Sequence, residues 1–229
     1  MCGRFTLQSP AELIREFFLL EDLPPLKPRF NIAPGQNVGC VVVDPDEGER
    51  VWVEYRWGLV PSWAKEPSIG YRMINARSET AAVKASFRKA FRSRRCLIAA
   101  DGFYEWRKTA RGKQPYWIHS EPMGLLAFAG LHESWRGPDG SVLRTCTILT
   151  CPANELLAPL HDRMPVILPR DDHELWLDPK VRSPELLQPL LEPFPSKGLA
   201  FRPVSRYVND ARHEGPDCLA MQDEPRFDG

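Results

Sequence analysis

The residue with the most reactive chemistry in this sequence is Cys2, provided that Met1 is removed. Processing enzymes remove an initiator methionine when the next side chain is small, so we expect Cys2 to begin the mature chain. Its α-amine and thiol then lie on adjacent carbons. An α-amine is roughly a tenth neutral at pH 7, whereas a lysine amine is neutral at only about 0.04%. Cys2 is therefore suited to attack an aldehyde through its amine, and its thiol can close the Schiff base as a five-membered thiazolidine.

Two further side chains could move protons during such a reaction. Glu105 lies in the strand-like stretch Gly102-Phe-Tyr-Glu-Trp, where apolar neighbours would desolvate its carboxylate and raise its pKa. His161 follows an apolar segment and precedes Asp162 and Arg163, so a neighbouring charge could set its tautomer. Each has an ordinary alternative. These are a buried, incidental cysteine for Cys2, a salt-bridged surface glutamate for Glu105 and a core histidine for His161.

Asn75 and Arg77 alternate along an extended segment just before a helix expected at Ser78. Side chains two residues apart on a strand project to the same side, so an amide and a cation should face one pocket. The alternatives are that Asn75 caps the start of the helix and that Arg77 forms a surface ion pair.

Composition indicates one large domain. A chain of 229 residues with 43% hydrophobic content can bury most of its unfolded surface in a single core. Lys plus Arg and Asp plus Glu both number 30, so any attraction to nucleic acid must come from local clustering of charge. Spacing around two phenylalanines favours a solvated helix face for the basic run Arg88, Lys89, Arg92, Arg94 and Arg95.

The six cysteines are scattered, with neither a Cys-x-x-Cys pair nor a His-x-x-x-His motif. Reduced thiols that pack as small apolar groups fit this pattern, and we expect no metal and no cofactor. Apolar runs stay far below the ~20 residues that span a bilayer, and no signal peptide is recognised at the start, so we expect no membrane partner and a cytoplasmic location.

Local patterns predict many short strands with helices at the periphery. Ser9, Pro10 and Glu12 predict a capped helix through Phe18, and a second helix should run from Ser78 to about residue 91. Segments 38–43 and 51–57 predict a hairpin. Further strands are expected at 96–101, 116–119, 125–131, 142–150 and 165–168, and further short helices at 152–158, 171–177 and 184–191.

This order, without regular alternation of strand and helix, predicts an α+β fold. We expect a single domain, residues 1–218, around a curved antiparallel β-sheet or barrel with peripheral helices. Residues 219–229 should form a loose C-terminal tail.

The chain resembles the SRAP family, the SOS-response-associated peptidase-like proteins that crosslink to abasic DNA. Each matching segment alone is weak, but their order and approximate spacing also match over residues 1 to about 218. The segments are Met1-Cys-Gly-Arg-Phe, Arg29-Phe-Asn-Ile-Ala-Pro-Gly, Arg56-Trp-Gly-Leu-Val-Pro-Ser-Trp, Ile74-Asn-Ala-Arg-Ser-Glu-Thr, Ala100-Asp-Gly-Phe-Tyr-Glu-Trp and Leu160-His-Asp-Arg-Met-Pro, with Val204-Ser and Glu214-Gly-Pro-Asp-Cys near the end.

The resemblance implies an SRAP-like fold and a lyase-like enzyme that binds single-stranded DNA. Cys2 would form a slowly reversible thiazolidine with an abasic-site aldehyde and so shield the lesion. Glu105 would act in ring opening, Schiff-base formation and reversal, and His161 would protonate the sugar oxygen. Asn75 would hydrogen-bond near the Cys2 adduct, and Arg77 would contact a DNA phosphate.

DNA binding needs a basic lining and aromatic platforms, and Arg4, Trp63 and Trp106 are suitable. Pro34 and Thr150 resemble family positions that line the groove. Core tryptophans and solvated arginines are the alternative interpretation.

Two other functions remain open at this point. One is an N-terminal-nucleophile amidohydrolase or thiol peptidase, which includes removal of Met1 by the protein itself. The other is a module that binds single-stranded or modified DNA without forming a bond. We expect a monomer, associated with the nucleoid if the source is bacterial, and the sequence identifies no replication-fork partner.

Overall fold

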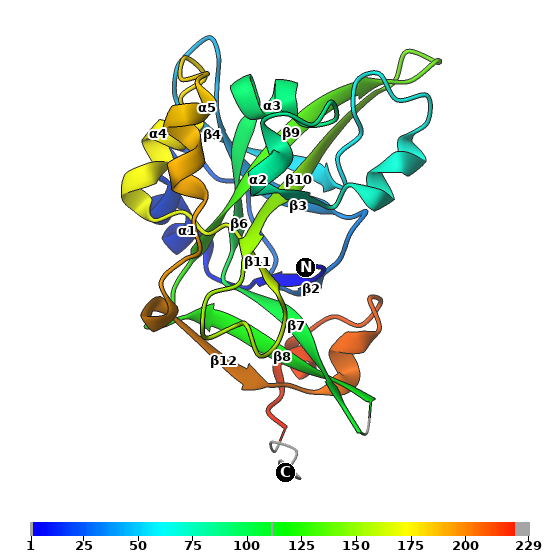
Figure 1. Cartoon of the computed structure of the whole chain (residues 1–229), viewed down its shortest axis with the longest axis vertical. Helices are drawn as coiled ribbons and strands as arrows, with labels where there is room; N and C mark the ends of the chain where they lie inside the picture. The colour runs from blue at the N-terminus through cyan, green and yellow to red at the C-terminus, as the bar shows by residue number, and fades with distance from the viewer. Residues whose placement is uncertain (1, 111, 223–229) are drawn as a thin grey trace.

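Five strands close into a barrel that forms the upper half of the molecule in Figure 1. A computed structural model describes residues 2–110 and 112–222 of the chain. Strand β9 pairs with β6 and with β10, and β10 pairs with β4, so the ladders run around the whole ring. The barrel strands are β3 (Asn37–Val43), β4 (Arg50–Trp57), β6 (Arg95–Ala100), β9 (Leu126–Arg136) and β10 (Val142–Pro152).

Two short strands extend the far end of β10. Strand β11 (Arg163–Pro165) pairs with it antiparallel, and β5 (Asn75–Arg77) pairs with it in parallel. The β4–β10 ladder is also parallel, whereas the other ladders of the barrel are antiparallel. The structure therefore confirms a single α+β domain built around a barrel and an antiparallel sheet.

A second, antiparallel sheet lies against one end of the barrel (Figure 1). Its strands, in spatial order, are β12 (Leu199–Pro203), β8 (Gly112–Ser120), β7 (Gly102–Thr109), β1 (Phe5–Leu7) and β2 (Arg29–Ile32). Asp101 joins barrel strand β6 to sheet strand β7. Its carboxylate accepts hydrogen bonds from the Thr6 hydroxyl and from the backbone N–H groups of Gln8 and Ser9, which fixes β1 at the junction.

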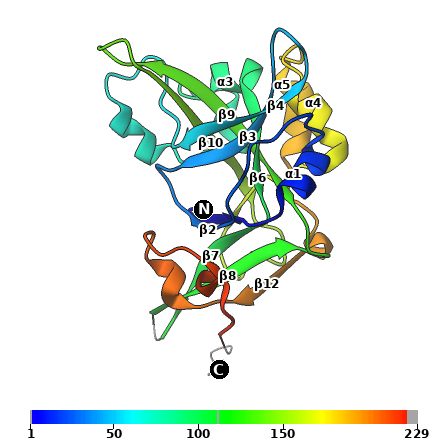
Figure 2. The same cartoon turned by 180° about the vertical axis from the view of Figure 1, so that it is seen from behind.

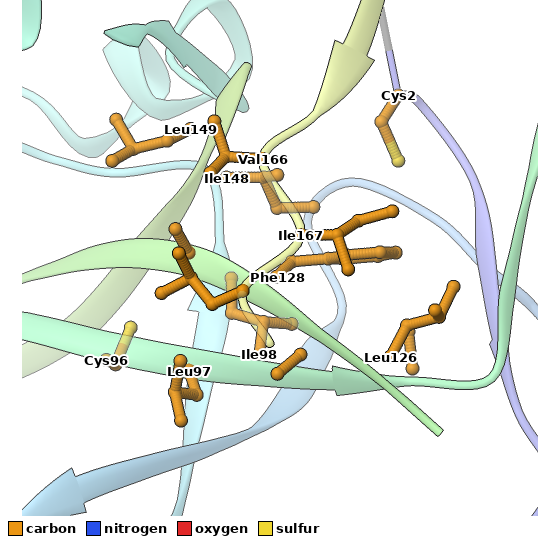
Figure 3. Packing of buried hydrophobic residues seen from close by; sticks show 14 of the residues in the cluster. Cys2, Cys96, Leu97, Ile98, Leu126, Phe128, Ile148, Leu149, Val166 and Ile167 are labelled. Atoms are coloured by element: carbon orange, nitrogen blue, oxygen red, sulfur yellow. The ribbon is translucent and has the colours of Figure 1, made fainter. Parts of the chain in front are cut away.

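The main core fills the barrel and the space between barrel and sheet. Phe128 of β9 lies at its centre, with its ring 5.9 Å from that of Phe5 and 5.9 Å from that of Phe103 (Figure 3). A smaller cluster covers the opposite face of the sheet, where Tyr104 and Trp117 pack against the C-terminal segment. Because side chains alternate along β7, Glu105 faces the barrel with Phe103, and its neighbours in sequence face the other way.

The helices are short and lie outside the barrel (Figures 1 and 2). Helix α1 (Ala11–Phe18) confirms the first predicted helix, but its N-cap is Pro10 and not Ser9. The Ser9 hydroxyl and backbone N–H instead donate to Asp101, so tertiary anchoring replaces the expected cap.

The second predicted helix is wrong as a single element. It is divided into α2 (Ser78–Ala81) and α3 (Arg88–Ser93). A continuous helix would have placed Val83 and Phe87 on one face, whereas Phe87 is buried and Val83 is 71% exposed. Burial of the aromatic side chain therefore prevails over local helix propensity.

The remaining predictions have mixed outcomes. The expected helix at 152–158 is absent from this described stretch, because β10 continues to Pro152 and turns follow it. Strand β11 covers Arg163–Pro165, so it shares only Pro165 with the strand predicted at 165–168. The other two helices are confirmed as η2 (Arg170–Asp172) with α4 (His173–Leu177), and α5 (Pro184–Leu187) with η3 (Gln188–Leu191). The predicted hairpin is confirmed as β3–β4.

Short 3-10 helices complete the fold as η1 (Pro67–Arg72), η4 (Ser196–Gly198), η5 (Arg206–Asn209) and η6 (Pro216–Leu219). An isolated bridge joins Val204 to Met221, and residues 223–229 of the predicted tail lie outside the described residues. All six cysteines are free and buried, as expected for reduced thiols. In the described part of the chain, no helix has the length and apolar character needed to cross a membrane.

Candidate active site around Cys2

Cys2 lies just before β1, where the barrel meets the sheet, and its side chain is fully buried. Figure 3 shows it at the edge of the cluster around Phe128 and Ile167. Its Sγ lies 3.8 Å from the carbonyl oxygen of Arg4. Burial, and secondly the charge of Glu105, raises the pKa of the Cys2 thiol far above its ordinary value. The thiol is therefore protonated at neutral pH and needs a base in order to act as a nucleophile.

Asn75 fixes the backbone of Cys2. Its Nδ2 donates a 2.8 Å hydrogen bond to the Cys2 carbonyl oxygen, so Asn75 does not serve as the helix cap considered from sequence. The parallel pairing of β5 with β10, which places Asn75 opposite Ile148, sets this position. The Asn75 Oδ1 atom is buried, and no hydrogen-bond partner for it occurs among residues 2–110 and 112–222. An acceptor is thus directed into the site beside Cys2.

Glu105 is 5% exposed in the middle of β7, opposite Tyr116 of β8. Burial raises the pKa of the Glu105 carboxyl, and the nearby His161 acts in the opposite direction. Since Glu105 also influences the Cys2 thiol, the fold brings Cys2, Glu105 and His161 within electrostatic reach of one another. A carboxyl of this kind exchanges protons closer to neutral pH than an exposed one does.

His161 lies in the loop between β10 and β11, with about a third of its side chain exposed. The backbone N–H of Arg163 donates to its Nδ1 at 3.0 Å, while an Asp162 carboxylate oxygen lies 2.7 Å from the same atom. Both contacts reach the ring through Nδ1, so they fix the orientation of the imidazole in the loop.

Arg163 anchors this loop from the barrel side. Its guanidinium donates two hydrogen bonds to the Glu79 carboxylate, at 2.5 and 2.9 Å, and also contacts the Thr150 carbonyl and hydroxyl oxygens. The Arg163 guanidinium lowers the pKa of Glu79. The sequence analysis gave no role to Glu79 and considered Arg163 only as a charge beside His161, although both lie inside the matching segments. One signal could have revealed them: the two motifs that supply site residues carry a negative charge in one, Glu79, and a positive charge in the other, Arg163.

Thr150 was expected to line a DNA groove, but it is fully buried beneath Arg163. Its hydroxyl also lies 3.5 Å from the Ala76 carbonyl oxygen, next to β5. The structure therefore gives Thr150 a supporting place under the site.

Arg4 and Trp106 lie on the face of the sheet opposite Glu105. The Arg4 guanidinium donates to Asn31 Oδ1 at 2.8 Å and to the Val208 carbonyl at 2.9 Å, and it lies 6.0 Å from the centre of the Trp106 ring. The Trp106 Nε1 atom donates to Asn209 at 2.7 Å. Both side chains therefore hold the C-terminal segment, and the structure does not bring them together with Cys2.

Trp63 and Arg77 are the expected DNA contacts that face solvent. Trp63 is 60% exposed in the loop that follows β4, and Arg77 is exposed at the end of β5. Pro34 is half-buried in the turn between β2 and β3. The base of the Trp63 loop is a close approach of Gly58 and Gly70, where a Cβ on Gly70 would lie 2.6 Å from the Gly58 carbonyl oxygen.

The site residues define a class of protein with a cysteine near the N-terminus and a buried carboxyl and an imidazole beside it. The chain belongs to the SRAP (SOS response associated peptidase) family, whose sequence profile matches residues 1–211. It is 44% identical over 223 residues to abasic site processing protein YoqW of Bacillus subtilis, covering 96% of this chain and 99% of the relative. It is 38% identical to abasic site processing protein HMCES of Gallus gallus, covering 84% of this chain and 66% of that protein.

Solved structures share the fold. A protein from Bacteroides thetaiotaomicron superposes with a TM-score of 0.85 at 22% identity, over 96% of this chain and all of that one. A phage-related protein from Bordetella bronchiseptica superposes with a TM-score of 0.72 at 28% identity, over 90% of this chain and 95% of that one.

Proposed function

We propose that this protein processes abasic sites in single-stranded DNA by forming a covalent thiazolidine between Cys2 and the aldehyde of the opened sugar. The observation that carries the proposal is the position of Cys2, whose carbonyl is held by Asn75 and whose thiol lies within reach of the charge of Glu105. The names of the relatives, which are abasic site processing proteins, support the substrate class.

The reaction begins after removal of Met1 exposes the α-amine of Cys2. The amine nitrogen attacks the aldehyde carbon, and loss of one water gives a Schiff base. The Cys2 sulfur then adds to the carbon of the C=N bond, and the nitrogen takes up a proton. The sum is amine plus thiol plus aldehyde giving thiazolidine plus water. Ring closure is intramolecular and is favoured for that reason.

Glu105 serves as the proton carrier at Cys2. The buried thiol holds its proton tightly, so sulfur attack requires a base nearby, and the raised pKa of Glu105 makes its carboxylate a better base than an exposed glutamate. The same carboxyl, once protonated, can return the proton when the crosslink reverses.

His161 serves as the acid that opens the sugar ring. Its imidazolium form donates the Nε2 proton to the departing ring oxygen, and Nδ1 keeps its proton beside the Asp162 carboxylate oxygen 2.7 Å away. Arg77 and Trp63 bind the strand, through a phosphate and a base respectively, since both are exposed near the site-forming strand β5 and the β4–β5 loop. Pro34 lines the groove that would hold this DNA strand. Arg4, Trp106 and Thr150 support the groove from the side away from the strand.

The test uses single-stranded DNA with one abasic site and three variants on a denaturing gel. Wild type and Cys218→Ala, which removes a buried thiol from the second cluster, should both give a heat-stable shifted band. Cys2→Ala and Cys2→Ser both keep the α-amine but lack the thiol, so neither should give a heat-stable band without reductant, and each adduct should appear only after borohydride reduction of the Schiff base.

Intact mass of the purified protein shows whether Met1 has been removed. A heat-stable shifted band with Cys2→Ala, formed without borohydride, would overturn the proposal. Peptide cleavage without shifted DNA would favour the thiol peptidase, and a complex seen only on native gels would favour non-covalent binding.

A further inference from the structure

A basic pocket lies on the outside of the barrel, between α3 and the start of α5. Its volume is about 650 Å³, and it is lined by Arg88, Lys89, Arg92, Ser93, Arg182 and Pro184. Figure 1 places α3 and α5 at the end of the barrel away from the second sheet and β1. The pocket is therefore separate from the site around Cys2.

The four cations of this pocket are exposed, and one acidic side chain lies near them, because a hydrogen bond from Ser183, and to a smaller extent the charge of Arg92, lowers the pKa of Glu185. In the described part of the chain, no salt bridge involves Arg88, Lys89, Arg92 or Arg182. Arg182 donates only a long hydrogen bond, from Nε to the Pro179 carbonyl. Glu185 follows the pocket in sequence, but its carboxylate accepts a hydrogen bond from Ser183 and does not line the pocket.

The neighbouring basic residues are used differently, which separates them from the pocket. Arg95 is buried and donates to the carbonyl oxygens of Trp176 and Phe91, and Arg94 pairs with Glu133 at 2.6 Å. These two stabilise the fold. Arg88, Lys89 and Arg92 belong to the same basic run but keep their charges at the surface, where the chain as a whole has a net charge of zero. Four positive charges around one cavity therefore stand out from the average field and favour a polyanion.

We infer that this pocket binds backbone phosphates of the DNA strand as it runs from the catalytic site, at a second contact remote from the lesion. The inference rests on the proposed function. Arginine side chains suit phosphate oxygens because their planar groups donate two parallel hydrogen bonds. The cavity, at about 650 Å³, is large enough to admit more than one phosphate group.

The chain connects the two sites directly. Arg77, proposed to contact a phosphate near the lesion, is followed by α2 and then by Arg88. Eleven residues span at most about 40 Å, so the two contacts lie no farther apart than that. About 12 nucleotides bridge this length even at the duplex spacing of about 3.4 Å per nucleotide. An oligonucleotide of about 16 nucleotides is therefore long enough to reach both contacts, and one of about 4 nucleotides serves as the short reference.

The experiment compares wild type with Arg88→Gln/Arg92→Gln/Arg182→Gln. The matched control, Arg15→Gln/Lys27→Gln/Lys197→Gln, removes three exposed cations elsewhere. A charge-preserving variant, Arg88→Lys/Arg92→Lys/Arg182→Lys, tests for incorrect folding. Binding to undamaged oligonucleotides is measured by fluorescence anisotropy from about 50 to 200 mM salt, and crosslinking is measured with abasic oligonucleotides of about 4 and 16 nucleotides whose long flank lies 5′ or 3′ of the lesion.

Loss of three phosphate contacts should reduce the salt-dependence slope on the long strand by about 2, so that wild-type affinity falls about 20-fold more than that of the glutamine variant over this range. The control and the lysine variant should keep the wild-type slope. All four proteins should crosslink the short oligonucleotide equally. On the long abasic oligonucleotides, the glutamine variant should crosslink less than wild type with only one of the two flank polarities.

A wild-type slope for the glutamine variant on the long undamaged strand would overturn the inference. Inorganic phosphate, added at constant ionic strength, gives a second test. If it removes the difference in slope between wild type and the glutamine variant, the inference is also overturned, because the pocket is then a small-anion site. If even wild type fails to crosslink the short oligonucleotide, the proposed function fails, while anisotropy on undamaged strands still decides whether the pocket binds DNA.

Discussion

The backbone N–H of Arg163 donates a 3.0 Å hydrogen bond to Nδ1 of His161, and the guanidinium of the same arginine grips Glu79. One residue thus contacts the ring of the proposed acid and connects its loop to α2 through Glu79. Arg163 is only 9% exposed, and its additional contacts to Thr150 leave it little freedom. It is a positioning residue, because it acts on the substrate only through His161.

Replacement of Arg163 by Met removes the guanidinium and keeps an unbranched apolar stem. The His161 loop should then shift, and the crosslinking rate at pH 7 should fall about 100-fold, as expected for a displacement on the order of 1 Å. Glu79→Gln should cost less, because the contacts of Arg163 with Thr150 persist. Single-turnover rates from pH 5 to 8, in which the acid limb shifts for Arg163→Met and not for Glu79→Gln, check the role. An unchanged profile for both variants contradicts it.

Asn75→Asp tests the hydrogen bond to the Cys2 carbonyl oxygen. Aspartate has the same size, but its carboxylate cannot donate, and it adds a negative charge near Glu105. We expect the crosslinking rate to fall by about 100-fold with little loss of thermal stability. Asn75→Gln keeps a donor as a control. Wild-type rates for Asn75→Asp would show that Asn75 is not needed to hold Cys2.

Glu105→Gln should stabilise the folded chain at neutral pH while it slows crosslinking. The folded-state pKa of Glu105 is raised by burial, so its favourable contribution is fully present below the ordinary value of 4.5 and is lost as pH rises through the folded value. Glutamine does not titrate. The gain in melting temperature should therefore grow from pH 4 to pH 7, measured by thermal denaturation. A gain that is equal at both pH values contradicts the raised pKa.

His173 should contribute to acid destabilisation. Burial lowers its pKa from 6.5 to about 4, and its ring stacks on Phe18 with Nε2 3.2 Å from the Leu168 carbonyl oxygen. A depressed histidine pKa contributes stability above pH 6.5 that is lost as pH falls toward 4, by up to about 3 kcal/mol. His173→Gln retains a donor and does not titrate, so urea unfolding between pH 7 and 4 should show a shallower decline. His132 shares the direction of shift and serves as the comparison.

Gly70→Ala tests the base of the loop that carries Trp63. A Cβ at this position meets the Gly58 carbonyl oxygen at 2.6 Å, and backbone cannot rotate aside as a side chain can. Overpacking should lower the free energy of unfolding by about 1–3 kcal/mol and should weaken binding to single-stranded DNA through displacement of Trp63. Gly124→Ala, whose Cβ would make only ordinary contacts of 3.6 Å with Ser120 Oγ and 4.0 Å with the Pro122 carbonyl oxygen, controls for substitution of a glycine in a loop. Full DNA affinity in a destabilised Gly70→Ala would separate the loop from binding.

Much of the site could be predicted from sequence because its members lie in short motifs. Cys2, Asn75, Glu105 and His161 were singled out from residue type and local context, and the fold brings them to one junction. The fold class followed from many short β-rich segments without regular helices between them.

Strand alternation could have predicted the position of Trp106. Glu105 and Trp106 are consecutive on β7, so their side chains face opposite sides of the sheet. The partners of Arg4 and Trp106 lie about a hundred residues or more away in sequence, at Val208 and Asn209, and no local pattern reveals such contacts. The division of the 78–91 helix depends on burial of Phe87 in the same way.

The hydrogen bonds of Arg4 also bear on the effect of truncating the gene. Arg4 lies two residues after Cys2 and donates to Asn31, Val208 and Asn209. The Asn31 amide in turn donates to the carbonyl oxygens of Asp210 and His213. Residues 208–213 thus hold the segment that contains Cys2 and β1. A premature stop codon just after residue 205 would keep Cys2 and the other proposed catalytic residues, and yet it would remove the contacts that hold the segment carrying Cys2.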